Sequence, residues 1–205
     1  MNKIYITTSA TSSGEAAHLG LLIVQNGVNI LIDGNQSEAF GLPLRIPLSV
    51  ATKHNPIFGN IILETITSTG TPTQQSLDAF GAVGLNIDPA DVDSKITTIL
   101  NAISNFGSGT LYTHDGIPRT YYDLDIGYNP VAINSNSVAN TLLSVAGIDM
   151  RDVVSSTGQE ANDYVGHLHL LDSSGDDTFT AYQYDGIFDT TVFHDNTGND
   201  TIIVE

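Results

Sequence analysis

The stretch His18–Asn35, HLGLLIVQNGVNILIDGN, decides the fold of this chain. It contains two runs rich in Leu, Ile and Val, His18–Gln25 and Val28–Asp33, joined by the dipeptide Asn26-Gly27. Asn-Gly favours a type I′ turn, in which both central residues have positive φ and the flanking strands pair antiparallel. The stretch therefore predicts a β-hairpin.

The turn also determines which residues oppose one another across the hairpin. With a two-residue loop at Asn26-Gly27, opposing residue numbers sum to 53, so His18 faces Asn35 and Gly20 faces Asp33. Side chains at these alternate positions project from one face of the sheet. The sequence thus predicts a polar group of three residues at one end of the hairpin.

Hydrophobic periodicity predicts further strands and helices around the hairpin. From Val92 to Ile103 apolar residues recur at spacings of four, three and four, which is typical of a helix. The predicted strands are Lys3–Thr8 and Gly59–Ile66, and the predicted helices begin at Leu77, at Asp88-Pro89 and at Ser137, the last ending at Ala146. The expected fold class is α+β: an antiparallel sheet with two principal helices packed on it, over residues 1–150, and an acidic β-rich extension over residues 151–205. The extension forms either a separate subdomain or extra strands of the main sheet.

The composition limits the partners of this chain. A length of 205 residues suffices for one domain with a core. Lys and Arg number 6 against 23 Asp and Glu, and the formal net charge is −17. Such a chain repels nucleic acid and anionic bilayers, whereas its carboxylates attract cations, and Ca²⁺ prefers oxygen ligands. We therefore expect no nucleic-acid partner.

The absence of cysteine excludes several kinds of site. A disulfide framework, a thiolate zinc site and a cysteine nucleophile all need Cys, and this sequence has none. The first residues, MNKIYITTSATSSGEAA, hold no apolar stretch of signal-peptide length, and no run has the length of a membrane span. We expect a protein without a membrane span.

The sequence changes character after Arg151. Residues Ser155–Glu205 contain no Lys or Arg and hold four short runs typical of strands. Two segments repeat 23 residues apart, DSSGDDTFT from Asp172 and DNTGNDTII from Asp195. Each reads Asp, two polar residues, Gly, one residue, Asp, Thr and an apolar residue.

This repeat resembles the second half of the Gly-rich nonapeptide of RTX-type secreted proteins, in which turn carboxylates bind Ca²⁺ and an apolar residue points into a parallel β-roll. The resemblance implies calcium at Asp172, Asp177, Asp195 and Asp200. It also implies extracellular export by an uncleaved C-terminal signal, although a cytoplasmic location fits the composition equally well. The leading Gly pair is missing and the copies are not adjacent, so we expect two Asp/Gly-rich turns in an antiparallel sheet as the alternative to a calcium site.

A second resemblance joins His18 to the stretch Asn134–Gly147, NSNSVANTLLSVAG. The order is a His that opens a hairpin near the amino terminus and a late Asn-x-Asn at the start of a Leu-rich helix. This order resembles the circularly permuted papain-like hydrolases, a clan that includes the lecithin:retinol acyltransferase group, over approximately residues 15–150. In those families the His precedes a Cys nucleophile that lies, often after an Asn, at the amino end of a helix.

The resemblance assigns roles to residues of this chain. It implies that His18 is the general base, that Ser135 stands in the place of the Cys, and that Asp33 or Asn35 orients the imidazole. Amides at the start of the helix, near Ser135 and Asn136, would stabilise an oxyanion. The implied activity is that of a hydrolase or acyltransferase that acts on an amide or ester bond of a small-molecule or peptide substrate.

The Ser in place of Cys leaves several explanations open. A Cys beside His⁺ is held as a thiolate, whereas a serine hydroxyl loses its proton only during attack and depends on its base. The chain is a working serine enzyme, one that has lost its activity, or one whose Cys was replaced by Ser. The non-catalytic alternative is a calcium-stabilised extracellular binding or scaffold module, in which NSNS only caps a helix.

Overall fold

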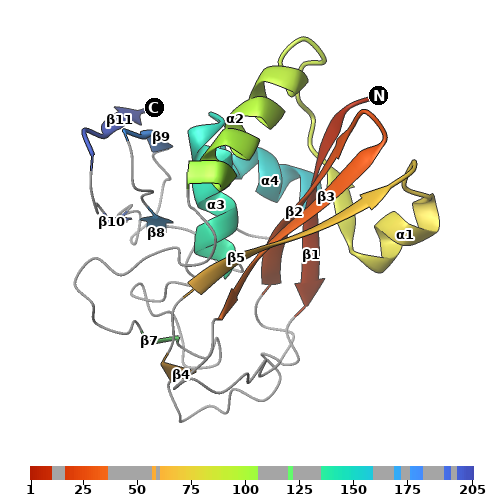
Figure 1. The fold of residues 1–205 in the computed structure, drawn as a ribbon, viewed down its shortest axis with the longest axis horizontal. Coiled ribbons are helices and arrows are strands. Elements are labelled where there is room, and N and C mark those ends of the chain that lie inside the picture. Colours follow the sequence, from red (N-terminus) through yellow and green to blue (C-terminus); the bar gives the residue numbers. More distant parts are fainter. Residues whose placement is uncertain are drawn as a thin grey trace.

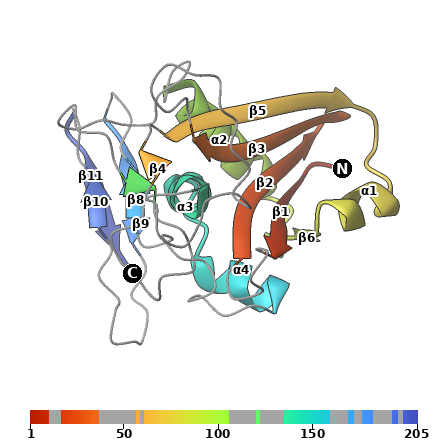
Figure 2. The same ribbon diagram turned by 90° about the horizontal axis from the view of Figure 1, so that it is seen from below.

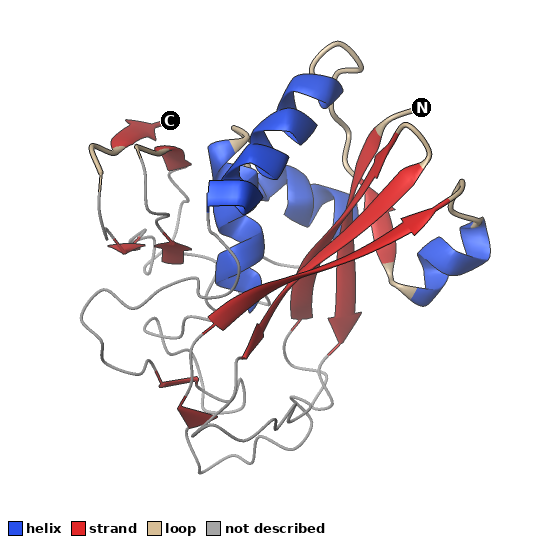
Figure 3. Ribbon diagram, in the orientation of Figure 1, coloured by secondary structure: helices blue, strands red, loops and turns tan. Residues whose placement is uncertain are grey.

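The computed structural model describes residues 1–10, 17–36, 57–58, 61–105, 120–121, 135–158, 169–171, 176–181, 192–194 and 198–205 (Figure 1). The strands are β1 (Lys3–Ala10), β2 (Ala17–Gln25), β3 (Val28–Gln36), β4 (Ile57–Phe58), β5 (Ile61–Thr69), β6 (Ala82–Gly84), β7 (Thr120–Tyr121), β8 (His169–Leu171), β9 (Thr178–Ala181), β10 (Val192–His194) and β11 (Thr201–Val204). The helices are α1 (Gln74–Ala79), α2 (Val92–Asn105), α3 (Ser135–Val145) and α4 (Met150–Thr157). Helices together with an antiparallel sheet confirm the α+β class (Figure 3).

The main sheet has the strand order β5-β3-β2-β1-β6, and all neighbouring strands are antiparallel. The predicted turn is present between β2 and β3, with φ of 51° at Asn26 and 80° at Gly27. Leu21 pairs with Ile32, so the predicted register is confirmed for the paired part of the hairpin. The predicted pairs His18 with Asn35 and Gly20 with Asp33 lie beyond the end of this ladder. The predicted strand Gly59–Ile66 corresponds to β5, which pairs along the whole of β3.

One face of this sheet is covered by α2, α3 and α4 (Figure 2). Leu19, Leu21 and Ile23 alternate along β2 and are fully buried in this core. Helix α3 is enclosed on all sides, since every side chain from 136 to 144 is buried. The opposite face of the sheet carries a smaller apolar cluster, in which Leu77 of α1 packs near Leu22.

Helix α2 begins later than the sequence predicts. Asp88 forms a turn before the helix, in which its carbonyl accepts the Asp91 N–H at 2.8 Å and its Oδ1 accepts the Ala90 N–H at 2.9 Å. This turn satisfies the backbone before the first helical residue, Val92. The predicted apolar stripe is confirmed, because Ile96 is fully buried in the core.

Helix α4 was not predicted by the sequence pattern. It begins with Asp149 as N-cap, which accepts the Arg151 N–H at 2.7 Å, and ends at Gly158 with φ of 70°. Its residues Met150 and Val153 are fully buried in the main core. The helix therefore spans the position at which the composition changes. Within the described part of the chain, no helix is long and apolar enough to cross a bilayer.

The four C-terminal strands form two parallel pairs, β8 with β10 and β9 with β11. His169 lies opposite Val192, and Thr178 lies opposite Thr201, so the register offset in both pairs equals the repeat length of 23 residues. The two repeat copies are therefore stacked, and the expectation of an antiparallel sheet is wrong. We call β8 and β9 the first coil, and β10 and β11 the second coil.

Helix α3 lies between the main sheet and the first coil (Figure 2). Thr141 Oγ1 accepts the Leu171 N–H at 2.9 Å. Ser144 Oγ accepts the Thr180 N–H at 3.1 Å and donates to the Thr180 carbonyl at 2.8 Å. The hydroxyl groups of α3 thus take the place of a neighbouring strand for the first coil.

Candidate functional site

The candidate site lies where strands β2 and β3 separate. Their ladder ends at the pair Leu21 and Ile32, while β2 stays paired with β1 and β3 stays paired with β5. Beyond this point the Leu19 N–H donates to Asn136 Oδ1 at 2.8 Å. Asn136 is almost completely buried and lies in the first turn of α3. Its side chain therefore binds the start of α3 to β2, one residue from His18.

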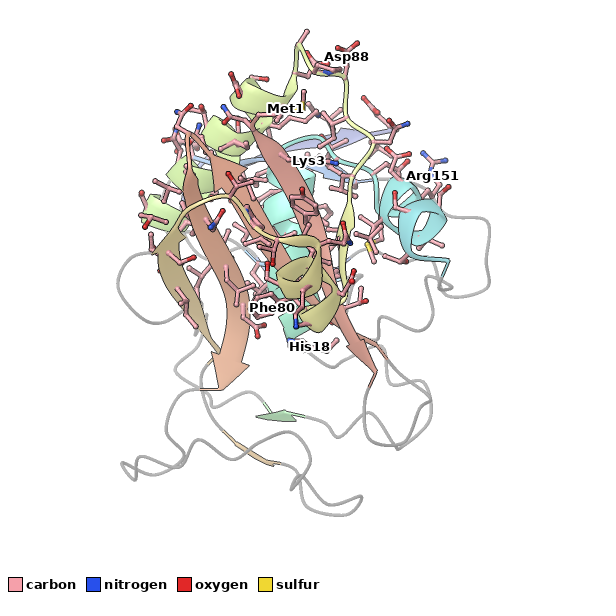
Figure 4. All side chains as sticks on the ribbon, turned by 90° about the vertical axis from the view of Figure 1, so that its right-hand side faces the viewer. Met1, Lys3, His18, Phe80, Asp88 and Arg151 are labelled. Atoms are coloured by element: carbon pink, nitrogen blue, oxygen red, sulfur yellow. The ribbon has the colours of Figure 1, made fainter. Side chains whose placement is uncertain are left out.

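His18 and Asp33 form an ion pair at this end of the sheet. The distance from His18 Nε2 is 3.0 Å to Asp33 Oδ1 and 3.1 Å to Oδ2, and the hydrogen-bond geometry is satisfied at Oδ2. Oδ1 is buried and has no hydrogen-bond donor of its own among the residues that the structure describes. Both side chains are partly exposed, 23% for His18 and 34% for Asp33. The labelled His18 lies at the lower end of the sheet in Figure 4.

The partner of Nε2 determines which ring nitrogen can act as a base. A carboxylate only accepts hydrogen bonds, so Nε2 carries the proton that is shared with Asp33. In the neutral imidazole the other nitrogen, Nδ1, then has the lone pair that accepts a proton.

A glycine of β2 lies in close contact with both neighbouring strands beside the ion pair. Gly20 lies on the same sheet face as His18, and a Cβ atom there would come within 2.6 Å of Thr7 Oγ1 and 3.1 Å of the Ile32 carbonyl. A larger residue at this position would therefore require the Thr7 side chain and the Ile32 carbonyl to move. Gly20 therefore fixes the close packing of the three strands beside the ion pair.

The structure brings together some of the predicted site residues. His18 and Asp33 are in contact, as the hairpin register predicts. Asn35 lies in β3 opposite Ile62, and Ser135 is the first residue of α3, but their side chains are outside the described part of the structure. Asn136, predicted near an oxyanion site, uses its side chain to hold β2.

An apolar pocket lies on the same face of the sheet as the ion pair. It has a volume of about 140 Å³ and is formed mainly by Leu22, Leu31, Ile66 and Phe80, with Asn29, Ser68, Pro72 and Ser76. A larger pocket, of about 420 Å³, is lined by Lys3 and its neighbours. It lies at the opposite end of the sheet, since Lys3 pairs with Val24 whereas His18 pairs with Ser9. Of these two pockets, the smaller one is therefore nearer to His18 along the sheet.

The predicted calcium ligands are only partly described. Asp172 and Asp195 lie outside the described residues. Asp200 Oδ1 accepts the Asp177 N–H at 2.9 Å, so this carboxylate oxygen bridges the two coils. The described stretches contain no group of three or more His, Asp or Glu side chains arranged to hold a metal ion.

The sequence pattern did not predict the polar contacts of α3. Asn136 holds the sheet, while Thr141 and Ser144 hold the first coil. A signal for the second group was present, because Ser137, Thr141 and Ser144 recur at the same spacings of four and three as the apolar stripe. A second stripe of small polar residues on a buried helix indicates hydrogen bonds to the backbone of other elements.

In comparisons with known proteins, no family model matches this chain, and neither the curated proteins nor the solved structures yield a significant match.

Proposed function

We propose that this protein is a hydrolase or acyltransferase that acts on an amide or ester bond, with Ser135 as nucleophile, His18 as general base and Asp33 as the residue that orients His18. The observation that carries the proposal is the ion pair of His18 Nε2 with Asp33 at the end of β2, one residue from Leu19, whose N–H donates to Asn136 in the first turn of α3. A nucleophile, a base and an orienting carboxylate in this order are the elements of a catalytic triad.

The proposed reaction begins with proton transfer. His18 Nδ1 takes the proton of Ser135 Oγ while Oγ attacks the carbonyl carbon of the substrate. Backbone N–H groups at the start of α3 carry the positive end of the helix dipole and stabilise the oxyanion. His18 then returns the proton to the leaving amine or alcohol. Water completes hydrolysis of the ester on Ser135, and an alcohol or amine in place of water completes acyl transfer.

Substrate-independent reagents test this proposal. A fluorophosphonate reacts with an activated serine, and we expect it to label the native protein at Ser135 but not the variants Ser135→Ala and His18→Ala. If the chain has lost its activity because Ser135 stands in the place of Cys, the fluorophosphonate will not label the native serine. Only the thiol introduced by Ser135→Cys will then show activation by His18. Iodoacetamide at about pH 6 should then modify the thiol of Ser135→Cys at least about tenfold faster than that of Ser135→Cys/His18→Ala, because His18 stabilises the thiolate.

If the native protein is not labelled, and if the thiol introduced by Ser135→Cys reacts at the same rate with and without His18, then His18 and position 135 do not form a catalytic pair.

The second candidate function is a non-catalytic, calcium-stabilised binding module that works outside the cell. The observation that favours it is the parallel stacking of the two repeat copies, with Asp200 bridging them. A ligand that binds only the folded state raises stability. Thermal unfolding in millimolar Ca²⁺ and in excess chelator tests this candidate, and an unchanged midpoint removes the calcium proposal.

A further inference from the structure

The two coils carry equivalent residues in different surroundings. Phe179 and Ala181 of the first coil are 2% and 8% exposed. Ile202 and Val204, which lie opposite them in the second coil, are 46% and 72% exposed. Among the described residues, the first coil is covered by α3 and by the second coil, whereas the second coil is covered on one side, by the first coil. The difference in exposure therefore comes from position in the stack, because the residues are apolar in both coils.

The backbone of β11 is also paired on one side. The N–H groups of Thr201 and Glu205 donate to the carbonyls of Asp177 and Ala181, at 2.8 and 3.0 Å. Because successive N–H groups of a strand point to opposite sides, those of Ile202 and Val204 point away from β9. Among the residues that the structure describes, β9 is the only strand neighbour of β11. These two N–H groups define an open edge.

Side-chain hydrogen bonds between the turns that precede β9 and β11 join the first coil to the second. Asp176 Oδ1 accepts the Asn199 N–H, and Asp200 Oδ1 accepts the Asp177 N–H, both at 2.9 Å. In the second coil, Asn199 and Asp200 stand where Asp176 and Asp177 stand in the first. The second coil thus offers an amide oxygen and a backbone N–H at the positions that the first coil uses to bind its neighbour.

We propose that the open edge of β11 is an acceptor site for a further parallel strand, supplied by a polypeptide segment with the pattern Gly-x-Asp-Thr-apolar. The Asp of that segment accepts the Asp200 N–H, and Asn199 Oδ1 accepts an N–H of its turn. Its apolar residues cover Ile202 and Val204. They lie opposite these residues in the same way that Ile202 and Val204 lie opposite Phe179 and Ala181. Each of these interactions has an observed equivalent among the contacts between the first coil and the second.

A second copy of this chain fits the edge less well. Its first coil cannot add in parallel, because Thr141 and Ser144 of α3 already cover that coil. Antiparallel pairing of two β11 strands about their common centre would place Asp200 of each copy opposite Glu205 of the other, and residues 155–205 contain no Lys or Arg to offset this repulsion. Residues 155–205 thus contain neither Lys nor Pro, the two residue types that commonly protect an exposed strand edge from added strands.

The test extends the full chain by one repeat. A copy of residues 183–205 is placed directly after Glu205, which continues the 23-residue register by one coil. The matched control carries the same copy with Pro at the two positions that correspond to Thr201 and Glu205, because the N–H groups of those residues donate to the preceding strand and Pro cannot donate to a strand ladder. Hydrogen exchange of the Ile202 and Val204 amides is measured in the native chain and in both extended chains.

We expect exchange at Ile202 and Val204 to slow at least about tenfold in the extended chain and to be unchanged in the Pro control. Equal exchange in the two extended chains would overturn the proposal. Sedimentation of the native chain gives the second arm of the test. A native dimer in which these two amides are protected would also overturn the proposal, since it would show that a second copy occupies the edge.

Discussion

The main sheet and the C-terminal coils lie on opposite sides of α3, and the helix holds them by different interactions (Figure 2). Toward the sheet, α3 presents apolar residues such as Val138 and Leu142, which join the main core. Toward the first coil it presents the hydroxyl groups of Thr141 and Ser144. A sheet face needs apolar cover, whereas a sheet edge needs hydrogen-bond partners. One helix meets both needs because its two stripes differ in chemistry.

The largest expected effect comes from the apolar stripe. Leu142 is fully buried, so Leu142→Ala should lower the free energy of unfolding by about 2–5 kcal/mol through lost burial and a residual cavity. Urea unfolding measures this change, and the sheet and coils should lose stability together. Phe80→Ala is the control, because Phe80 is 47% exposed. Equal losses in the two variants would contradict the proposed role of the stripe.

The second effect concerns the contact of α3 with β2. Asn136→Leu leaves the buried Leu19 N–H without its acceptor, which should cost about 1–3 kcal/mol of unfolding free energy. Hydrogen exchange at Leu19 should become faster at the same time. Asn101→Leu, on the exposed face of α2, is the matched control and should change stability by less than about 0.5 kcal/mol. A Leu19 amide that exchanges at its native rate would show that another group replaces Asn136.

A third variant separates the coils from the sheet. Thr141→Val keeps the shape of the side chain but removes the acceptor of the Leu171 N–H, so we expect a loss of about 1–2 kcal/mol. Exchange should increase at Leu171 and not in β1 or β2. Thr97→Val is the control, because Thr97 is an exposed helical Thr that donates to the carbonyl four residues earlier. Faster exchange throughout the sheet would mean that the two regions are not separable.

The smallest expected effect on stability is at the candidate site. Asp33→Ala removes a partly exposed ion pair, so the unfolding free energy should change by less than about 1 kcal/mol. In the Ser135→Cys background the reaction of the introduced thiol with iodoacetamide should nevertheless slow severalfold, because His18 loses its orienting partner. Asp33→Asn retains an acceptor for Nε2 and should slow the reaction less. Equal rates in all three proteins would remove Asp33 from the proposed mechanism.

Local patterns were sufficient to predict the hairpin and its polar end. Asn26-Gly27 determines the turn, and the turn determines that His18 and Asp33 lie on one face. The same holds for α2, in which the spacing of apolar residues predicts the buried side. In each case the interacting residues are close in sequence, so composition and spacing contain the information.

Long-range contacts were not predictable in this way. Asn136 binds a backbone group 117 residues earlier, and its local sequence indicates only a helix cap. The repeat of 23 residues was visible, but a repeat alone does not say whether its copies pair parallel or antiparallel. That choice depends on the chain between the copies and on the cover that α3 provides for the first coil.

The cover that α3 gives to the first coil has a consequence for the order of folding. Two paired strands are marginally stable alone, and stacked coils gain stability from a neighbour that is already formed. We therefore expect β1–β3 and α3 to assemble first, the first coil to form on α3, and the second coil to form last. Pulsed hydrogen exchange during refolding would contradict this order if β2 and β11 became protected at the same time. Synthesis from the amino terminus delivers the segments in the same order, so each part emerges after the surface on which it folds.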